Sequence, residues 1–264
     1  MLWICFVKGS RVMFHRSAVV LFIGLSLAGC VTTSNENASV VADAVDPSLR
    51  AAATTAEANH DYKGAIQHLN TLFQRHGDDK GIGLALARNL RYADQAQTGA
   101  DVMQSLLTRY PNDPELLIEL GKDYLAADRA ALAIKTLYRA RDVAPQRWDV
   151  YSTLGVALDT DGHSAEALQA FAHAAELSPD NPAVLNNLAL AQAVTGHLDQ
   201  AIATMSQAAD LPSANMLVRQ NLALLLALKG DAAKAEKLAR RDLPPDIAKS
   251  NIEILRALAA APKQ

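Results

Sequence analysis

The sequence of 264 residues predicts an all-α protein, a right-handed α-solenoid of about six helix–turn–helix repeats followed by a C-terminal capping helix. Three observations predict this fold. From Asp46 onward the chain aligns with itself at a constant spacing of about 34 residues, and no gap is needed. Small residues recur at two positions of each repeat, where two helices can cross closely, and glycines recur at a third, where a turn is expected.

Residues 1–29 have the composition of a secretory signal peptide. Basic residues from Lys8 to Arg16 precede an uncharged apolar run at residues 18–28, which is shorter than the roughly 20 residues that a spanning helix needs. The end of this run and the two residues after it, Leu27-Ala28-Gly29-Cys30, resemble the lipobox of bacterial lipoproteins. The alternative is an ordinary signal peptide with a chance cysteine. We also hypothesise that translation starts at Met13, because a signal peptide does not need the apolar patch before it.

The lipobox resemblance implies that cleavage exposes Cys30 and that lipid is attached to it. Val31 at the following position implies transfer to the outer membrane, with the chain facing the periplasm. Residues 30–45 are polar and lack an apolar period, so we expect a lipidated cysteine and a flexible tether. Loss of residues 1–29 would leave 22 basic against 28 acidic residues, a formal charge of −6, which gives no electrostatic footprint for nucleic acid.

The predicted repeat array covers residues 46–245. Its blocks begin at Asp46, Lys80, Pro114, Trp148, Pro182 and Met216. One column of small residues is Ala53, Ala87, Gly121, Gly155, Ala189 and Ala223, and the other is Ala65, Gly99, Ala133, Ala167, Ala201 and Ala235. Larger apolar residues recur beside them, among them Leu137 and Phe171, so small residues are expected to face large ones across each helix pair.

Turn and cap residues support the same period. Gly162, Gly196 and Gly230 lie midway through their blocks, and Asp46-Pro47 is suited to begin the first helix as N-cap and first-turn residue. A helix–turn–helix period of about 34 residues with this pattern resembles the tetratricopeptide repeat. Residues 246–264 are predicted to form a capping helix and tail.

The resemblance implies a concave face, lined by the first helix of each repeat, on which a protein ligand binds. Side chains expected there are Arg88, Arg91, Lys122, Asp149, Asn186, Asn187, Gln220 and Asn221. Asn187 and Asn221 occupy equivalent positions of successive blocks, in the column where peptide-binding members often hold a ligand backbone by an amide. The alternative is that asparagine is merely a solvent-facing residue at this position.

No feature of the sequence indicates an enzyme. The histidines that follow Cys30 are scattered, and His163 and His197 simply follow turn glycines. We find no nucleophile motif, metal-ligand spacing or phosphate-binding loop, and therefore expect no catalytic residue, metal, cofactor or small-molecule substrate.

Two segments in the C-terminal part of the chain indicate a more specific family resemblance. The segments Val218–Leu224 and Asp242–Pro245 resemble those of the TadD family, the tetratricopeptide lipoproteins of the Tad system, and this system assembles Flp pili. The resemblance implies a non-enzymatic outer-membrane scaffold that binds envelope proteins of the pilus or secretion machinery and assists localisation or assembly of the secretin or its neighbours. The alternative is a general outer-membrane adaptor that recruits periplasmic cell-wall enzymes.

Overall fold

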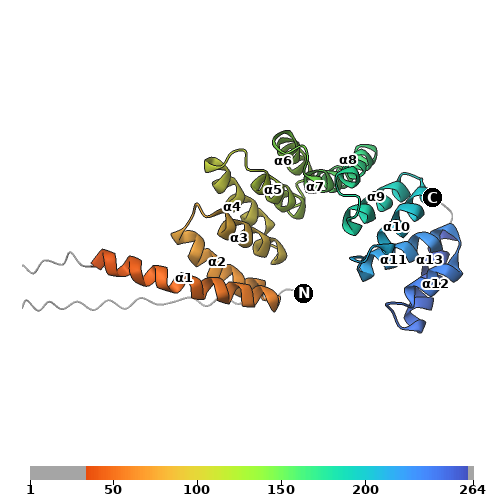
Figure 1. The fold of residues 1–264 in the computed structure, drawn as a ribbon, viewed down its shortest axis with the longest axis horizontal. Helices are drawn as coiled ribbons and strands as arrows, with labels where there is room; N and C mark the ends of the chain where they lie inside the picture. Colours follow the sequence, from red (N-terminus) through yellow and green to blue (C-terminus); the bar gives the residue numbers. More distant parts are fainter. Residues whose placement is uncertain (1–33, 261–264) are drawn as a thin grey trace, which may run out of the picture. The chain divides into compact units, whose positions relative to one another are not determined.

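Residues 34–260, the part of the chain that the computed structural model describes, form thirteen α-helices and no strand (Figure 1). The helices are α1 (Ser34–Ala58), α2 (Tyr62–Arg75), α3 (Lys80–Tyr92), α4 (Ala96–Arg109), α5 (Pro114–Ala126), α6 (Ala130–Val143), α7 (Trp148–Thr160), α8 (Ser164–Leu177), α9 (Pro182–Val194), α10 (Leu198–Asp210), α11 (Met216–Lys229), α12 (Ala232–Ala239) and α13 (Pro245–Ala260). The predicted signal peptide and Cys30 lie outside the described residues. No helix within them has the length and apolar character needed to cross a membrane.

The described helices pair in the order that the repeat spacing predicts. Helices α3, α5, α7, α9 and α11 begin at the first residues of the last five blocks. From α2 to α12 each helix packs against the next along the chain, and first helices also pack on one another in the pairs α3–α5, α5–α7 and α9–α11. The predicted α-solenoid is therefore confirmed. We call α3, α5, α7, α9 and α11 the first helices, and α2, α4, α6, α8, α10 and α12 the second helices.

Close helix crossings explain the two columns of small residues, all twelve of which are buried. A Cβ added to Gly121 would lie 2.8 Å from the side chain of Leu137, and one added to Gly155 would lie 2.6 Å from the ring of Phe171. These distances are too short for any side chain atom, so the large residue of the second helix fills the space that the glycine leaves. The predicted small-against-large packing is confirmed at these crossings.

The turn inside each repeat contains one residue in the left-handed conformation. Gly162, Gly196 and Gly230 have φ of 84°, 88° and 97°. The equivalent residues of the first three repeats are His60, Asp94 and Asp128, with φ of 58°, 59° and 56°. The glycine column therefore continues through the whole array, although sequence inspection found only its glycine members. Aspartate is among the few residues that tolerate this conformation.

The start of the array differs from the sequence-based expectation. The predicted tether overlaps α1, which begins at Ser34 and contains Pro47 in its interior, so Asp46-Pro47 does not open this helix. The carboxylate of Asp46 instead contacts α2 and its end: Oδ1 accepts a hydrogen bond from Nη1 of Arg75 at 2.8 Å, and Oδ2 pairs with His76. Because this carboxylate is bound to α2, it is unavailable as an N-cap, and the helix continues past the proline at the cost of one backbone hydrogen bond.

The predicted capping helix is confirmed as α13. It packs against α11 and α12, and Ala248 is fully buried in this contact. Asp242, just before α13, forms a two-point salt bridge with Arg219 of α11, with Nε–Oδ2 and Nη2–Oδ1 distances of 2.9 and 2.5 Å. The end of the array is thus joined to its last first helix by both apolar and polar contacts.

The left-handed conformation of Gly162 predicts how substitutions at this position change the stability of the protein. Gly162→Ala should lower the free energy of unfolding by about 1 kcal/mol, since a Cβ finds no atom within 4 Å and only the backbone is strained. Gly162→Asp should cost less, because aspartate already occupies this conformation at Asp94 and Asp128. Denaturant unfolding measures both, with Gly77→Ala as a control at a glycine outside the left-handed region. Equal stability of Gly162→Ala and the parent would contradict the strain argument.

Candidate functional site

The eight residues predicted for the ligand-binding face all lie on first helices, but they do not form one continuous surface of free side chains. Arg88 and Arg91 lie on α3, Lys122 on α5, Asp149 on α7, Asn186 and Asn187 on α9, and Gln220 and Asn221 on α11. Arg88 is exposed. The other seven enter polar contacts that separate into clusters along the row of first helices.

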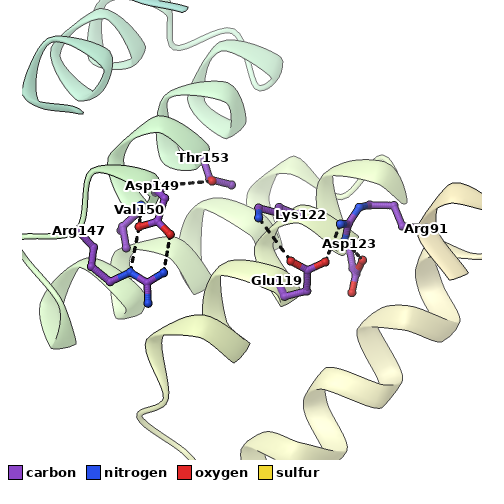
Figure 2. A network of polar contacts seen from close by, with 8 residues as sticks. All are labelled: Arg91, Glu119, Lys122, Asp123, Arg147, Asp149, Val150 and Thr153. Carbon is purple, nitrogen blue, oxygen red and sulfur yellow. Dashed lines mark hydrogen bonds and ion pairs between the residues drawn. The ribbon is translucent and has the colours of Figure 1, made fainter. Parts of the chain in front are cut away.

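The first cluster joins α3 to α5 (Figure 2). Arg91 places Nη1 2.5 Å from Oδ1 of Asp123 and Nη2 2.6 Å from Oε1 of Glu119. Lys122 approaches the other oxygen of Glu119 at 3.4 Å. Burial opposes the charge of Arg91, but the carboxylates of Glu119 and Asp123 outweigh it and raise the pKa of this guanidinium. Arg91 therefore links two repeats, and a ligand would have to compete with two carboxylates for it.

Asp123 is the most unusual member of this cluster. Its side chain is fully buried, and its Oδ2 has no hydrogen-bond partner among the described residues. Oδ2 faces Gly99, where an added Cβ would lie only 3.1 Å away. Burial raises the pKa of Asp123 to about 7, an effect that the neighbouring Arg91 offsets only in part. The carboxyl group thus titrates near neutral pH inside the packing between two repeats.

A second cluster lies at the start of α7. Arg147 donates from Nε and Nη2 to the two carboxylate oxygens of Asp149, at 3.0 and 2.5 Å (Figure 2). Asp149 also accepts the backbone N–H of Val150 at 3.1 Å. A carboxylate in the first turn is favourable because the helix dipole is positive at this end. Asp149 therefore has a structural explanation that requires no ligand.

A third cluster consists of amides that connect three first helices. Asn187 of α9 donates to the hydroxyl of Ser152 on α7 at 3.3 Å, and Asn186 donates to the oxygen of Asn187 at 3.4 Å. Asn221 of α11 donates to the oxygen of Asn186 at 2.7 Å. Neither of the two sequence-based interpretations, ligand contact or solvent exposure, included these interhelical bonds. Replacing Asn187 and Asn221 together would therefore disturb helix packing as well as a binding surface.

Gln220 belongs to the C-terminal contact instead. Its amide lies 3.4 Å from Oδ2 of Asp242, the carboxylate that Arg219 holds. It also approaches the carbonyl of Ala239 at 3.5 Å. This residue stabilises the junction of α11 with the end of the array.

A mostly apolar hollow lies beside the amide cluster, between α7 and α9. It has a volume of about 190 Å³ and is lined by Phe171, Ala191, Asp159 and Thr160, and by four further residues, Asn187, Val156, Leu190 and Val194. Val156 is 41% exposed and Val194 is 69% exposed. Sequence inspection predicted Asn187 but missed the three apolar residues, although a signal was available: Val156 and Leu190 occupy equivalent positions of successive blocks. We call these four residues the first-helix hollow.

Comparison with known families and structures finds similarity to tetratricopeptide-repeat proteins. The family model "Tetratricopeptide repeat" matches residues 160–211. The fold is similar to a thermophilic tetratricopeptide-repeat protein of Thermus thermophilus, with a TM-score of 0.60 and 19% identity over 69% of this chain and 98% of that one. PilF of Pseudomonas aeruginosa gives a TM-score of 0.61 and 16% identity over 80% and 98%. No curated protein matches the chain.

A further similar structure is YrrB, described as a tetratricopeptide-repeat protein with an unusual peptide-binding site. It has a TM-score of 0.52 and 15% identity over 70% of this chain and 97% of YrrB. At these identities the similarity shows the fold alone. Residues 160–211 match the tetratricopeptide-repeat model, and the described array has the fold of tetratricopeptide-repeat proteins, an architecture that generally serves as a scaffold for protein interactions.

The buried carboxyl group of Asp123 predicts that the stability of the folded protein depends on pH. Folded Asp123 keeps its proton up to a pH of about 7, whereas its usual pKa is 3.8, so between these values the native state binds more protons than the unfolded chain. Stability contributed by this group is therefore fully present below pH 3.8 and is lost as the pH rises through 7, by about 1.4 kcal/mol per pKa unit at most. Asp123→Asn should remove this fall in denaturant unfolding between pH 5 and 8. An unchanged pH profile in the variant would contradict the assignment, and Asp128→Asn, at an exposed turn, is the control.

Proposed function

We propose that this tetratricopeptide-repeat chain is a non-enzymatic outer-membrane lipoprotein that acts as a protein-interaction scaffold in Flp pilus assembly by the Tad system. In this role it is anchored through Cys30, faces the periplasm and assists localisation or assembly of the secretin or neighbouring components. The lipobox at residues 27–30 supports the anchor. The resemblance of the C-terminal segments to TadD supports the pathway.

The observation that carries the scaffold role is the first-helix hollow. Val194 keeps more than two thirds of its surface in water, and Val156 lies beside it on the neighbouring first helix. Covering apolar surface of this kind favours association, at roughly 25 cal/mol per Å² of area removed from water. Asn187 at the edge of the hollow can add a hydrogen bond to a peptide backbone, worth about 0.5–1.5 kcal/mol net. An extended segment with an apolar side chain fits this combination.

The two segments that carry the Tad resemblance contact each other at the end of the array. They contain Arg219 and Asp242, which form the two-point salt bridge described above. The support for the Tad role remains the resemblance of the two segments.

Fold similarity to YrrB is consistent with a peptide ligand, since that protein is described as having a peptide-binding site. The other candidate role, an adaptor for periplasmic cell-wall enzymes, uses the same anchor and the same hollow. The two roles differ in the partner, so identification of the bound protein distinguishes them.

The anchor is tested by Cys30→Ser. Loss of the thiol should block lipid attachment, because the sulfur is the acylation site, and the protein should accumulate unprocessed or leave the outer-membrane fraction. Membrane fractionation and mass spectrometry of the N-terminus measure both effects. Unchanged fractionation and processing would contradict the lipoprotein proposal.

The hollow is tested by crosslinking in the native envelope. A photoreactive phenylalanine analogue at position 194 should give adducts with the pilus secretin or its neighbours, and the same analogue at position 143, an exposed valine of α6, should not. In the purified system, Val194→Glu should weaken capture of that partner by about tenfold or more, because complex formation would bury an unpaired charge. Val143→Glu is the matched control. Adducts with cell-wall enzymes alone would favour the adaptor role, and no position-specific adduct would reject the hollow.

A further inference from the structure

The contact between Gly99 and Asp123 departs from the contact that the following repeats make at the same place. The equivalent pairs of the next two repeats are Ala133 with Ala157 and Ala167 with Ala191. All four alanines are buried, so stacking requires only small apolar side chains at these positions. Glycine is less favourable than alanine inside a helix, and a carboxyl group is costly to bury. Packing alone therefore does not explain why this pair replaces two alanines.

The two oxygens of Asp123 have different surroundings. Oδ1 accepts a hydrogen bond from Arg91 of α3, whereas Oδ2 borders the space beside Gly99 of α4 and has no partner among the described residues. A Cβ added to Gly99 would also lie 3.2 Å from the backbone oxygen of Ala87 of α3, so this oxygen borders the same space. A protonated Oδ2 can donate a hydrogen bond toward a carbonyl oxygen, and an ionised one cannot. The geometry around Oδ2 thus favours the protonated carboxyl group.

Charged groups act on Asp123 from two helices. Arg91 of α3 and Lys122 of α5 favour its ionised form, whereas Glu119 of α5 opposes it. Helices α4, α6 and α7 also pack on α5, but none of their described side chains forms an ion pair or a hydrogen bond with Asp123. Burial outweighs the cations and raises the pKa of Asp123 to about 7. Because α3 and α4 supply the groups that border this carboxyl group, it keeps its proton near neutral pH only while they cover it.

We propose that Asp123 is a proton-controlled joint, which makes opening of the N-terminal helices α1–α4 depend on pH and leaves opening of the C-terminal helices independent of it. When α1–α4 separate from α5, Asp123 enters water and releases its proton. When α8–α13 open from the other end, α3 and α4 still cover Asp123, so no proton is released.

The repeat architecture allows the two ends to behave differently. Each repeat contacts only its neighbours, so one end of the array can open while the other remains folded. The pH dependence of stability then belongs to one end of the array rather than to the whole. The first-helix hollow lies between α7 and α9, outside this joint, so failure of either proposal leaves the other intact.

Hydrogen exchange followed by mass spectrometry tests the joint on the full chain. Opening constants are obtained at pH 5 and pH 8 after correction for the intrinsic exchange rate. The closed state holds a proton that the open state, with its usual pKa of 3.8, has lost, so opening becomes easier as the pH rises toward 7. The opening constants of α3 and α4 should therefore rise by up to about 100-fold, and those of α8, α9 and α10 should change by less than about threefold. An equal rise at both ends, or no rise in α3 and α4, would overturn the proposal.

Two variants remove the proton in different ways. Asp123→Asn keeps the shape of the side chain, and opening of α3 and α4 should then change by less than about threefold between pH 5 and pH 8. Asp123→Ala combined with Gly99→Ala reproduces the pair of the next repeat and should give the same result. Asp101→Asn, which removes an exposed carboxylate of α4, is the matched control and should keep the full rise. Persistence of the rise in either Asp123 variant, or its loss in the control, would contradict the joint.

Discussion

Close approach of paired helices is the constraint on which the other features of this protein depend. At Gly155 the second helix is so near that a single added carbon would lie 2.6 Å from the ring of Phe171. Equivalent small residues are buried in every repeat. Because the crossing recurs at a constant spacing, it determines which face each first helix turns toward its neighbours and which positions remain for polar contacts.

Polar side chains on the first helices mostly bind one another. Arg91 is held by two carboxylates between α3 and α5, whereas the links from α7 to α11 are made by Ser152 and uncharged amides. These contacts join repeats in addition to the apolar core. The ionic links respond to pH through Asp123, and the amide links do not contain a group that titrates near neutrality. The binding surface that we propose lies beside the amide links, where exposed apolar atoms are not paired within the chain.

Equivalent positions of a repeat protein allow structural and functional features to be separated. The left-handed turn is present in all six repeats, whether the residue is glycine, aspartate or histidine, so its role is conformational. Grooves between second helices also recur, between α4 and α6 and between α6 and α8, so stacking of the repeats accounts for them. Stacking does not require an exposed apolar side chain such as that of Val194, which is therefore the better candidate for binding.

The sequence by itself determined the repeat period, the helix pairs, the buried small residues and the closing helix, because each depends on side-chain size and turn chemistry that recur at a constant spacing. Cys30 and the Tad role rest on sequence resemblance, and Cys30 lies outside the described residues. Tertiary structure alone decided the partners of the polar residues. Arg91 and Asp123 are 32 residues apart, and Asn186 and Asn221 are 35 apart, so their contacts depend on how neighbouring repeats stack. The same reason explains why Asp46 was misassigned as an N-cap: its carboxylate has a stronger alternative in Arg75, 29 residues away, which only the packing of α1 on α2 brings within reach.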